Sequence, residues 1–374
     1  MSSATVPARA GLAALLAATL FLPMAAGAAG EGRLASEARK ASGAPALAAA
    51  VITSDSIDVY ASGRRRAGSP DRITHDDAFA IGSDAKAMLA TLIAQEIERG
   101  RLRWDTTIEE VLPDAIATAR TEYRAVTIAE LLDHRSGLVP LVTRDELVRV
   151  PRFRGSVVSQ RRQAARWALR QPPVAVPGAA TVYSNAGYVV AAAMLERVTG
   201  RSYEQLLQRR LLDPLGMHAS FGWPGAARPM DAPWGHEMVD GRLVAVHPAD
   251  EGNRMPGWIN PAGNLSLGTR DFARFVQLHL RGLRGTATLL DTGTFLRMHT
   301  PPAGFAYTSG WAVIGENGQQ ISFHEGNSGL FYAFMIVDAQ HDVAAVVVAN
   351  ADTPQVAEAA TTLAIRLMQA KVQP

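Results

Sequence analysis

From residue 83 the chain reads Ser83-Asp84-Ala85-Lys86-Ala87-Met88-Leu89-Ala90-Thr91-Leu92-Ile93, and a glycine follows at position 100. Apolar residues recur at the i+3, i+4 and i+7 positions counted from Ala85, which predicts a helix over 83–99 that ends at Gly100. No charged residue lies between Lys86 and Glu96, and the face opposite the apolar stripe carries only small residues. Because a helix that is apolar on nearly all sides is buried, we expect Lys86 to lie inside the protein.

Lys86 is also unusual in composition, because only three of the 37 basic residues are lysines. Arginine stays charged in proteins, whereas a buried lysine can lose its proton and then act as a base. Ser83 and Lys86 are three residues apart and share one face of the helix, as a serine nucleophile and its general base require. The other interpretation is that Ser83 simply caps the helix, and the S-x-x-K pattern alone does not separate the two.

Two further motifs follow along the chain. A Pro-Gly turn at 177–178 leads to Tyr183-Ser184-Asn185, and His324-Glu325-Gly326 lies on a predicted late strand. S-x-x-K, then Tyr-x-Asn, then Lys- or His-x-Gly resembles the serine β-lactamase and penicillin-binding protein superfamily, in particular its class C branch. Connecting phrases at 131–138, 213–217 and 261–264 resemble the same branch. The resemblance covers residues 45–350.

The resemblance implies roles for the first two motifs. Ser83 would attack a carbonyl carbon and hold the acyl group. Lys86 and Tyr183 would share the serine proton, with Tyr183 kept acidic by nearby cations and passing the proton to the leaving group. Which of these two groups is the first base stays open. Asn185 would hydrogen-bond the amide of the substrate or Lys86.

By the same resemblance, the third motif would contact the substrate. His324 replaces the lysine often found there by a weaker, titratable cation. Gly326 would leave room for the substrate to lie against the strand edge. The backbone N–H groups of Ser83 and Asn327 would form the oxyanion hole.

Two acidic residues depart from the family pattern. Asp84 suits the first turn of a helix, but its carboxylate would keep Lys86 protonated unless the side chain turns outward. Glu325 stands where a small polar residue often contacts an anionic substrate group, and a carboxylate there would repel such a group. Glu325 therefore favours a neutral ester or amide, or a substrate with a free amine, over β-lactams and D-Ala-D-Ala peptides.

Other polar residues receive simpler interpretations. His134 and Ser136 invite a second triad, but within the phrase at 131–138 we expect them to fix a loop. The Arg161-Arg162 pair is interpreted as solvated surface charge. A formal net charge of +2 over 374 residues gives no nucleic-acid footprint. Neither His-Glu pair extends to the zinc-binding pattern H-E-x-x-H, and we expect no metal and no cofactor.

Residues 1–28 are typical of a signal peptide. Arg9 precedes an apolar stretch at 12–24, and Ala26-Gly27-Ala28 precedes the expected cut. The stretch is short and alanine-rich for a membrane span, so we expect an exported protein, periplasmic or secreted, with no stable span after cleavage. An uncleaved membrane anchor is the alternative. The chain has no cysteine, so its stability must come from its core rather than from disulfides.

Apolar runs predict strands at both ends of the chain. We expect a hairpin from 46–53 and 56–62, further strands at 311–314, 320–324, 331–337 and 343–348, and a closing helix over 353–368. These elements predict an α/β (α+β) fold, in which helices flank an antiparallel sheet and a mostly helical lobe adjoins it, as in the β-lactamase/transpeptidase fold. Residues 29–374 would form this domain, with a sheet lobe at about 33–95 and 300–374 and a helical lobe at about 96–299. The site would lie between the lobes.

The sequence therefore predicts an exported serine hydrolase that forms an acyl-enzyme on Ser83. Its substrate would be a small ester, amide or peptide, with cell-wall peptides among the candidates. DD-peptidase, β-lactamase, esterase and D-amino-acid peptidase activities all stay open. The alternative is a non-catalytic relative that binds cell-wall peptides or a partner, with Asp84 and Glu325 as marks of a decayed site. The intact Lys86, Tyr183 and Asn185 favour the enzyme.

Overall fold

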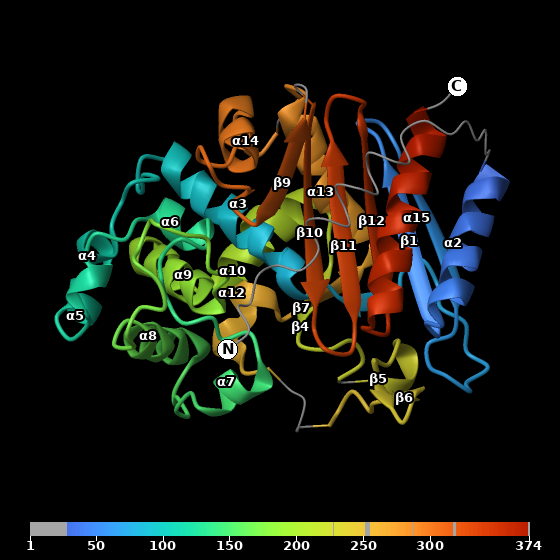
Figure 1. The fold of residues 1–374 in the computed structure, drawn as a ribbon, viewed down its shortest axis with the longest axis horizontal. Coiled ribbons are helices and arrows are strands. Elements are labelled where there is room, and N and C mark those ends of the chain that lie inside the picture. Colours follow the sequence, from blue (N-terminus) through green and yellow to red (C-terminus); the bar gives the residue numbers. More distant parts are fainter. Residues whose placement is uncertain (1–27, 227, 251–254, 287, 317–318, 373–374) are drawn as a thin grey trace.

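A seven-stranded antiparallel sheet organises the computed structural model, which describes residues 28–226, 228–250, 255–286, 288–316 and 319–372 (Figure 1). The strand order is β2-β1-β12-β11-β10-β9-β8. The strands are β1 Ala46–Ile52, β2 Ile57–Gly63, β8 Tyr307–Thr308, β9 Trp311–Glu316, β10 Gln319–Asn327, β11 Tyr332–Asp338 and β12 Val343–Ala349. The predicted strands are therefore confirmed, and β1 pairs with β12, so the two ends of the domain share one sheet. The predicted leader lies outside the described residues except for Ala28.

The central strands are apolar without interruption because helices cover both faces of the sheet. Every residue of β1 and of β12 is buried, as is typical of strands packed on both sides. Helices α2 (Ala28–Ser42) and α15 (Pro354–Val372) cover one face (Figure 1). Helix α13 (Thr269–Leu283) packs on β1 and β12 from the other face. This helix lies in the stretch 96–299 that we assigned to the helical lobe, yet it belongs to the packing of the sheet.

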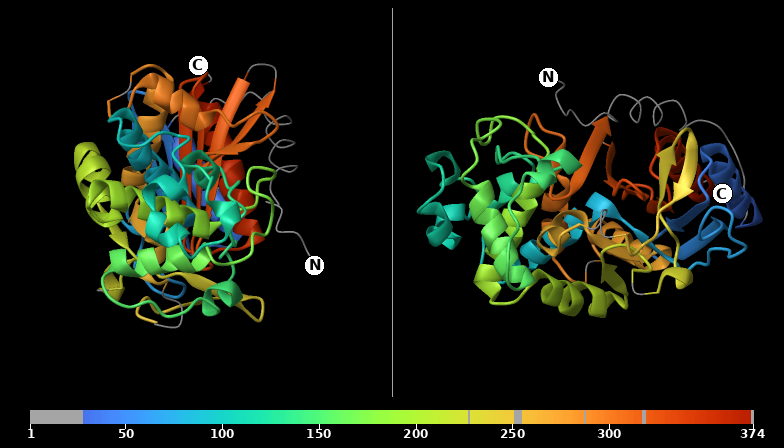
Figure 2. Two further views of the ribbon diagram at one scale, coloured as in Figure 1. Left: turned by 90° about the vertical axis from the view of Figure 1, so that its left-hand side faces the viewer. Right: turned by 90° about the horizontal axis from the view of Figure 1, so that it is seen from below.

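The middle of the chain supplies most of the remaining helices, which gather beside the sheet (Figure 2). They are α4 Ile108–Val111, α5 Pro113–Ile116, α6 Ile128–Leu132, α7 Arg144–Val148, α8 Val157–Ala168, α9 Asn185–Thr199, α10 Tyr203–Leu207, α11 Asp213–Leu215, α12 Asn260–Gly263 and α14 Thr292–His299. Short turns of 3-10 helix lie at Thr121–Tyr123, Pro229–Asp231 and Gly257–Ile259, and a π-helical turn at Gln208–Leu212. The α/β (α+β) prediction is confirmed.

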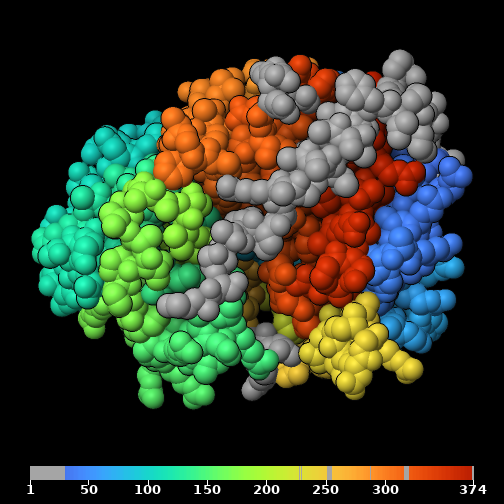
Figure 3. Space-filling model, viewed as in Figure 1, coloured from blue at the N-terminus to red at the C-terminus, as the bar shows by residue number. Residues whose placement is uncertain are grey.

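Two small sheets complete the fold. One has the order β3 (Ala78–Ala80), β7 (Leu265–Gly268) and β4 (Ala219–Phe221), and the other is the hairpin of β5 (His236–Val239) and β6 (Arg242–Ala245). The space-filling view shows α2 and the C-terminal strands and helix on one side of the molecule and the helical segments on the other (Figure 3). Within the described ranges, no helix has both the length and the apolar character that crossing a membrane requires.

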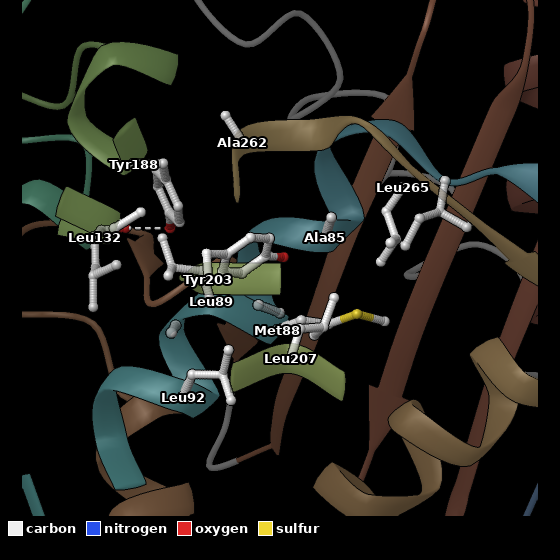
Figure 4. Close-up of a cluster of buried hydrophobic side chains, with 14 of the residues drawn as sticks. Ala85, Met88, Leu89, Leu92, Leu132, Tyr188, Tyr203, Leu207, Ala262 and Leu265 are labelled. Carbon is white, nitrogen blue, oxygen red and sulfur yellow. Dashed lines mark hydrogen bonds between the residues drawn. The ribbon is translucent and has the colours of Figure 1, made fainter. Parts of the chain in front are cut away.

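Helix α3 (Ala85–Glu98) runs through the core between the sheet and the helical segments. All its residues from Ala85 to Glu96 are buried, which confirms the prediction of a helix that is buried nearly all round. Met88, Leu89 and Leu92 pack among side chains from α10 and neighbouring elements (Figure 4). The first two residues of the predicted helix differ, because Ser83 and Asp84 belong with Gly82 to a separate 3-10 turn, η1 (Gly82–Asp84). Lys86 is thereby held at the start of a rigid, central helix.

Candidate active site

Ser83 lies in η1, at the point where this turn touches strand β10. Gly82 has φ +49°, and a Cβ at this position would lie 2.6 Å from the backbone nitrogen of Asn327. Only glycine allows such a close approach in this conformation. Helix α3 begins after Asp84, whose side chain makes no capping bond, and the Ser83 hydroxyl contacts Lys86 instead. The interpretation of Ser83 as a simple helix cap is therefore wrong.

Lys86 is fully buried and its Nζ has three hydrogen-bond partners. These are Ser83 Oγ at 2.9 Å, Asn185 Oδ1 at 2.7 Å and the carbonyl oxygen of Ala262 at 2.5 Å. The orientation of the Asn185 amide is set by its Nδ2, which donates to the carbonyl of Leu141 at 2.8 Å. Two of the partners can only accept, so a neutral amine would give them its two N–H groups and turn its lone pair to the Ser83 hydroxyl.

Burial lowers the pKa of Lys86 well below its ordinary value, and the nearby Asp84 opposes this shift. The ammonium form is disfavoured because the site offers little water to solvate a charge. The rings of Tyr183 and Tyr188 flank Nζ, with centroids at 4.8 and 5.4 Å. The expected buried lysine beside Ser83 is thus present, in surroundings that suit a base.

Tyr183 approaches Ser83 from the loop before α9. Burial raises the pKa of its phenol, while a hydrogen bond with Ser83 and the charge of Asp84 act in opposite directions on it. The acidification that the family resemblance implied is therefore not found, and the phenol keeps its proton at neutral pH. The imidazole of His134 lies 4.1 Å from the Tyr183 ring, and its Nδ1 accepts the N–H of Ser184 at 3.1 Å. His134 fixes this loop, as predicted, and it does so directly beside the site.

Asp84 turns away from Lys86 and toward strand β10. Its Oδ1 lies 3.0 Å from Nδ1 of His324, and Nε2 of the same ring lies 3.0 Å from the hydroxyl of Tyr307. Burial and the charge of Lys86 lower the pKa of His324 to about 3. Burial and the neighbouring Glu325 raise the pKa of Asp84 well above its ordinary value. Both ring nitrogens of His324 are engaged within the protein, which disfavours the predicted contact of this residue with a substrate.

Gly326 lies on β10, as predicted, but the space next to it is occupied by protein atoms rather than left open for a substrate. A Cβ on Gly326 would lie 1.9 Å from the carbonyl oxygen of Ile81 and 3.1 Å from Cγ of Asp84. The missing side chain thus lets η1 and β10 touch, and it brings the backbone N–H of Asn327 next to the turn that carries Ser83. The oxyanion-hole role of these two N–H groups stays a prediction that this proximity favours.

Gly326→Ala is expected to lower the free energy of unfolding by about 3 kcal/mol or more, because neither the Ile81 carbonyl nor β10 can move aside without breaking the contact. Chemical denaturation of the purified variant measures the loss. Gly293→Ala is the matched control, since nothing lies within 4 Å of a Cβ at that position, and its stability should stay within about 1 kcal/mol of the wild type. Equal stabilities of the two variants would contradict the packing role.

Glu325 does not face the substrate side of β10. Successive side chains on a strand point to opposite faces, and Glu325 shares its face with Phe323, in the core between the sheet and α15. Its carboxyl is partly buried next to Tyr332, and burial raises its pKa. The expected direct repulsion of an anionic substrate group by Glu325 is not supported by this placement.

Arg161 corrects the interpretation of the Arg161-Arg162 pair as surface charge. Its side chain is fully buried in α8 and donates to Glu196, to Glu204 at 2.6 Å and to the carbonyl of Trp258 at 3.2 Å. Arg162 is exposed, as expected. The buried ion cluster ties α8, α9 and α10 to the segment 257–263, which ends at the Ala262 carbonyl that binds Lys86.

The structure brings Ser83, Lys86, Tyr183 and Asn185 together, with His324, Gly326 and Asn327 on the adjoining strand. Three neighbours were not predicted as site residues: His134, which we expected only to fix a loop, and Ala262 and Tyr307. Ala262 acts through its backbone carbonyl, and Tyr307 lies outside all the motifs, so neither gave a side-chain signal in the sequence.

Comparisons with known proteins agree with this geometry. A model of the Beta-lactamase family matches residues 32–369. Penicillin-binding protein 4 of Amycolatopsis lactamdurans is 30% identical over 318 residues, which cover 82% of this chain and 81% of that protein.

Two solved structures have the same fold. A β-lactamase from Sulfitobacter sp. EE-36 superposes with a TM-score of 0.73 at 20% identity, over 92% of this chain and 99% of that one. The D-amino acid amidase from Ochrobactrum anthropi SV3, complexed with L-phenylalanine amide, gives a TM-score of 0.72 at 20% identity, over 92% and 99% of the two chains. The S-x-x-K and Tyr-x-Asn residues meet around one buried lysine, and the family model spans nearly the whole domain. The chain therefore belongs to the Beta-lactamase family, within the serine β-lactamase and penicillin-binding protein superfamily.

Proposed function

We propose that this chain is an exported serine hydrolase that forms an acyl-enzyme on Ser83, with Lys86 as the first base. The observation that carries the proposal is the set of contacts around Lys86 Nζ. Asn185 and Ala262 take its two N–H groups, which leaves the lone pair of a neutral amine for the Ser83 hydroxyl. Burial supports that neutral amine by lowering the pKa of Lys86.

In the acylation step, Lys86 Nζ takes the hydroxyl proton as Ser83 Oγ attacks the carbonyl carbon of the substrate. The negative charge that develops on the carbonyl oxygen would be accepted by the N–H groups of Ser83 and Asn327. Tyr183 donates its phenolic proton to the leaving alcohol or amine and is reprotonated from Lys86. The raised pKa of Tyr183 suits a proton donor better than a first base. Water then attacks the acyl-enzyme and releases the acid with a free Ser83.

Small esters and amides are the proposed substrates. The amidase from Ochrobactrum anthropi SV3, which has this fold and is complexed with L-phenylalanine amide, supports an amide substrate, and the similarity to penicillin-binding protein 4 supports acyl-enzyme formation on a serine. Export to the periplasm or the medium is part of the proposal and rests on the leader at residues 1–28. Cell-wall-derived peptides would be accessible there.

Hydrolysis of p-nitrophenyl butyrate tests the proposal, with Ser83→Ala as the comparison. We expect turnover by the wild-type chain and a loss of about 10³-fold or more in kcat/KM in the variant, because the attacking oxygen is missing. The tryptophan fluorescence of the two proteins checks that both are folded. Equal rates for the two proteins would contradict the role of Ser83, and no Ser83-dependent turnover of esters or amides would favour the non-catalytic alternative.

A further inference from the structure

A buried hydrogen-bonded chain, Asp84–His324–Tyr307, lies beside the Ser83–Lys86 pair. It joins η1, β10 and β8, and its two links are both 3.0 Å long. Asp84 is fully buried, and Tyr307 and His324 are 4% and 5% exposed. None of the proton transfers in the proposed reaction involves Asp84, His324 or Tyr307, although His324 belongs to the third motif of the family.

The direction of the hydrogen bonds depends on the charge of Asp84. Its Oδ1 contacts His324, whereas its Oδ2 is buried and has no hydrogen-bond partner among the described protein atoms. An ionised carboxylate with an unpartnered buried oxygen is costly, whereas the carbonyl oxygen of a protonated acid in the same place costs much less. Lys86 makes no hydrogen bond to Asp84, because its three partners lie elsewhere. A charged Lys86 would lower the pKa of Asp84, but the neutral amine of the proposed reaction carries no such charge. No positive charge at neutral pH comes from the remaining titratable neighbours of Asp84 and His324. These neighbours are Glu325, His134, Tyr183 and Tyr332.

A protonated Asp84 determines the direction of both hydrogen bonds, from Asp84 to His324 and from His324 to Tyr307. Its Oδ1–H donates to Nδ1 of His324, so the one proton of the neutral imidazole is on Nε2 and is donated to the oxygen of Tyr307. The ring of Tyr307 lies 4.7 Å from that of His134, which in turn lies 4.1 Å from that of Tyr183. The hydrogen-bonded residues Asp84, His324 and Tyr307 thus end at a stack of rings that contacts Tyr183.

We propose that Asp84 is a protonated acid that holds His324 as the neutral Nε2–H tautomer, so that the third motif carries no positive charge and the site selects acyl groups without an anionic substituent. This inference rests on the proposed function and names its substrate class. A cation on the third motif would attract a carboxylate close to the reacting carbonyl, whereas a neutral, fully engaged imidazole offers such a carboxylate neither charge nor hydrogen bond.

Nitrogen-15 NMR of histidine-labelled protein tests the tautomer without any reaction. At pH 7 we expect the His324 signals of an Nε2–H imidazole, assigned by their loss in His324→Gln. Asp84→Asn should keep this tautomer, because an amide can donate to Nδ1 as the protonated acid does, whereas Asp84→Ala should lose it. An Nδ1–H tautomer or an imidazolium in the wild-type protein would overturn the assignment.

The ratio of kcat/KM for p-nitrophenyl butyrate to that for p-nitrophenyl hemisuccinate tests the selectivity, because the two acyl groups differ mainly in one carboxylate. The wild type should favour the butyrate. The double variant Asp84→Ala/His324→Lys places a cation in the third motif and should shift the ratio toward the hemisuccinate by about tenfold or more, mainly through KM. An unchanged ratio would overturn the selectivity.

Glu325→Gln is the matched control, because it removes a carboxylate from the opposite face of the same strand. Its ratio should stay within about twofold of the wild type. A shift in this variant but not in the double variant would overturn the inference and assign the selectivity to Glu325. Absence of any ester turnover by the wild type would instead contradict the proposed function, and the NMR experiment then decides the state of Asp84 by itself.

Discussion

Lys86→Arg is expected to abolish acyl-enzyme formation, with a loss of about 10³-fold or more in kcat/KM for a p-nitrophenyl ester. A guanidinium does not release its proton in a protein, so it cannot accept the proton of Ser83. Because acylation needs the neutral amine, kcat/KM of the wild type should rise with pH as Lys86 loses its proton. That rise should be complete well below pH 10.5, since burial lowers the pKa of Lys86. Stopped-flow hydrolysis across this pH range measures both effects.

Two controls separate the loss of a base from the loss of the fold. Lys40→Arg makes the same substitution at an exposed position of α2 and should keep wild-type activity. Lys86→Met replaces the buried amine by an uncharged side chain of similar length and should be as inactive as the arginine variant while remaining folded by circular dichroism. A folded Lys86→Arg protein with activity within tenfold of the wild type would refute the role of Lys86 as base.

Arg161→Ala is expected to lower the free energy of unfolding by about 3–5 kcal/mol, because it leaves Glu196 and Glu204 without their buried cation. It also removes the donor to the Trp258 carbonyl, which helps to hold the segment that presents Ala262 to Lys86. Urea denaturation measures the change in stability. Any Arg161→Ala protein that still folds should also lose ester hydrolysis.

Arg162→Ala is the matched control for this prediction. The two arginines are adjacent on α8, but Arg162 is exposed, and its removal should change the free energy of unfolding by no more than about 0.5 kcal/mol. Equal losses of stability in the two variants would show that the buried ion cluster does not contribute as the structure indicates.

Local periodicity was enough to predict most of the elements that form the fold. The continuous apolar runs of β1 and β12 and the apolar helix α3 are patterns that depend on burial alone, and the structure confirms them. The 3-10 turn at Gly82–Asp84 was missed because its shape depends on the contact between Gly82 and Asn327, which no local pattern reports. The sheet-packing position of α13 was missed for the same reason, since periodicity identifies an apolar stripe but not its partner.

The candidate site divides in a similar way. The spacing of Ser83 and Lys86, together with the family resemblance that implied a role for Asn185, correctly predicted that these three residues meet, and the structure gives their distances. The contact between Asp84 and His324 joins residues 240 positions apart, and Arg161 meets Glu196 and Glu204 from 35 and 43 positions away. Charged residues in such pairs resemble surface charge in the sequence, and only the fold shows that they are buried together.

The role of Ser83 as nucleophile is tested most directly by the mass of the intact protein. The wild-type chain is mixed with p-nitrophenyl butyrate, quenched in acid over a time course and then digested to locate the modified peptide. We predict a transient gain of one butyryl group on Ser83, absent from both Ser83→Ala and Lys86→Arg. A butyryl group on another residue, or equal labelling of Ser83→Ala, would contradict an acyl-enzyme on Ser83.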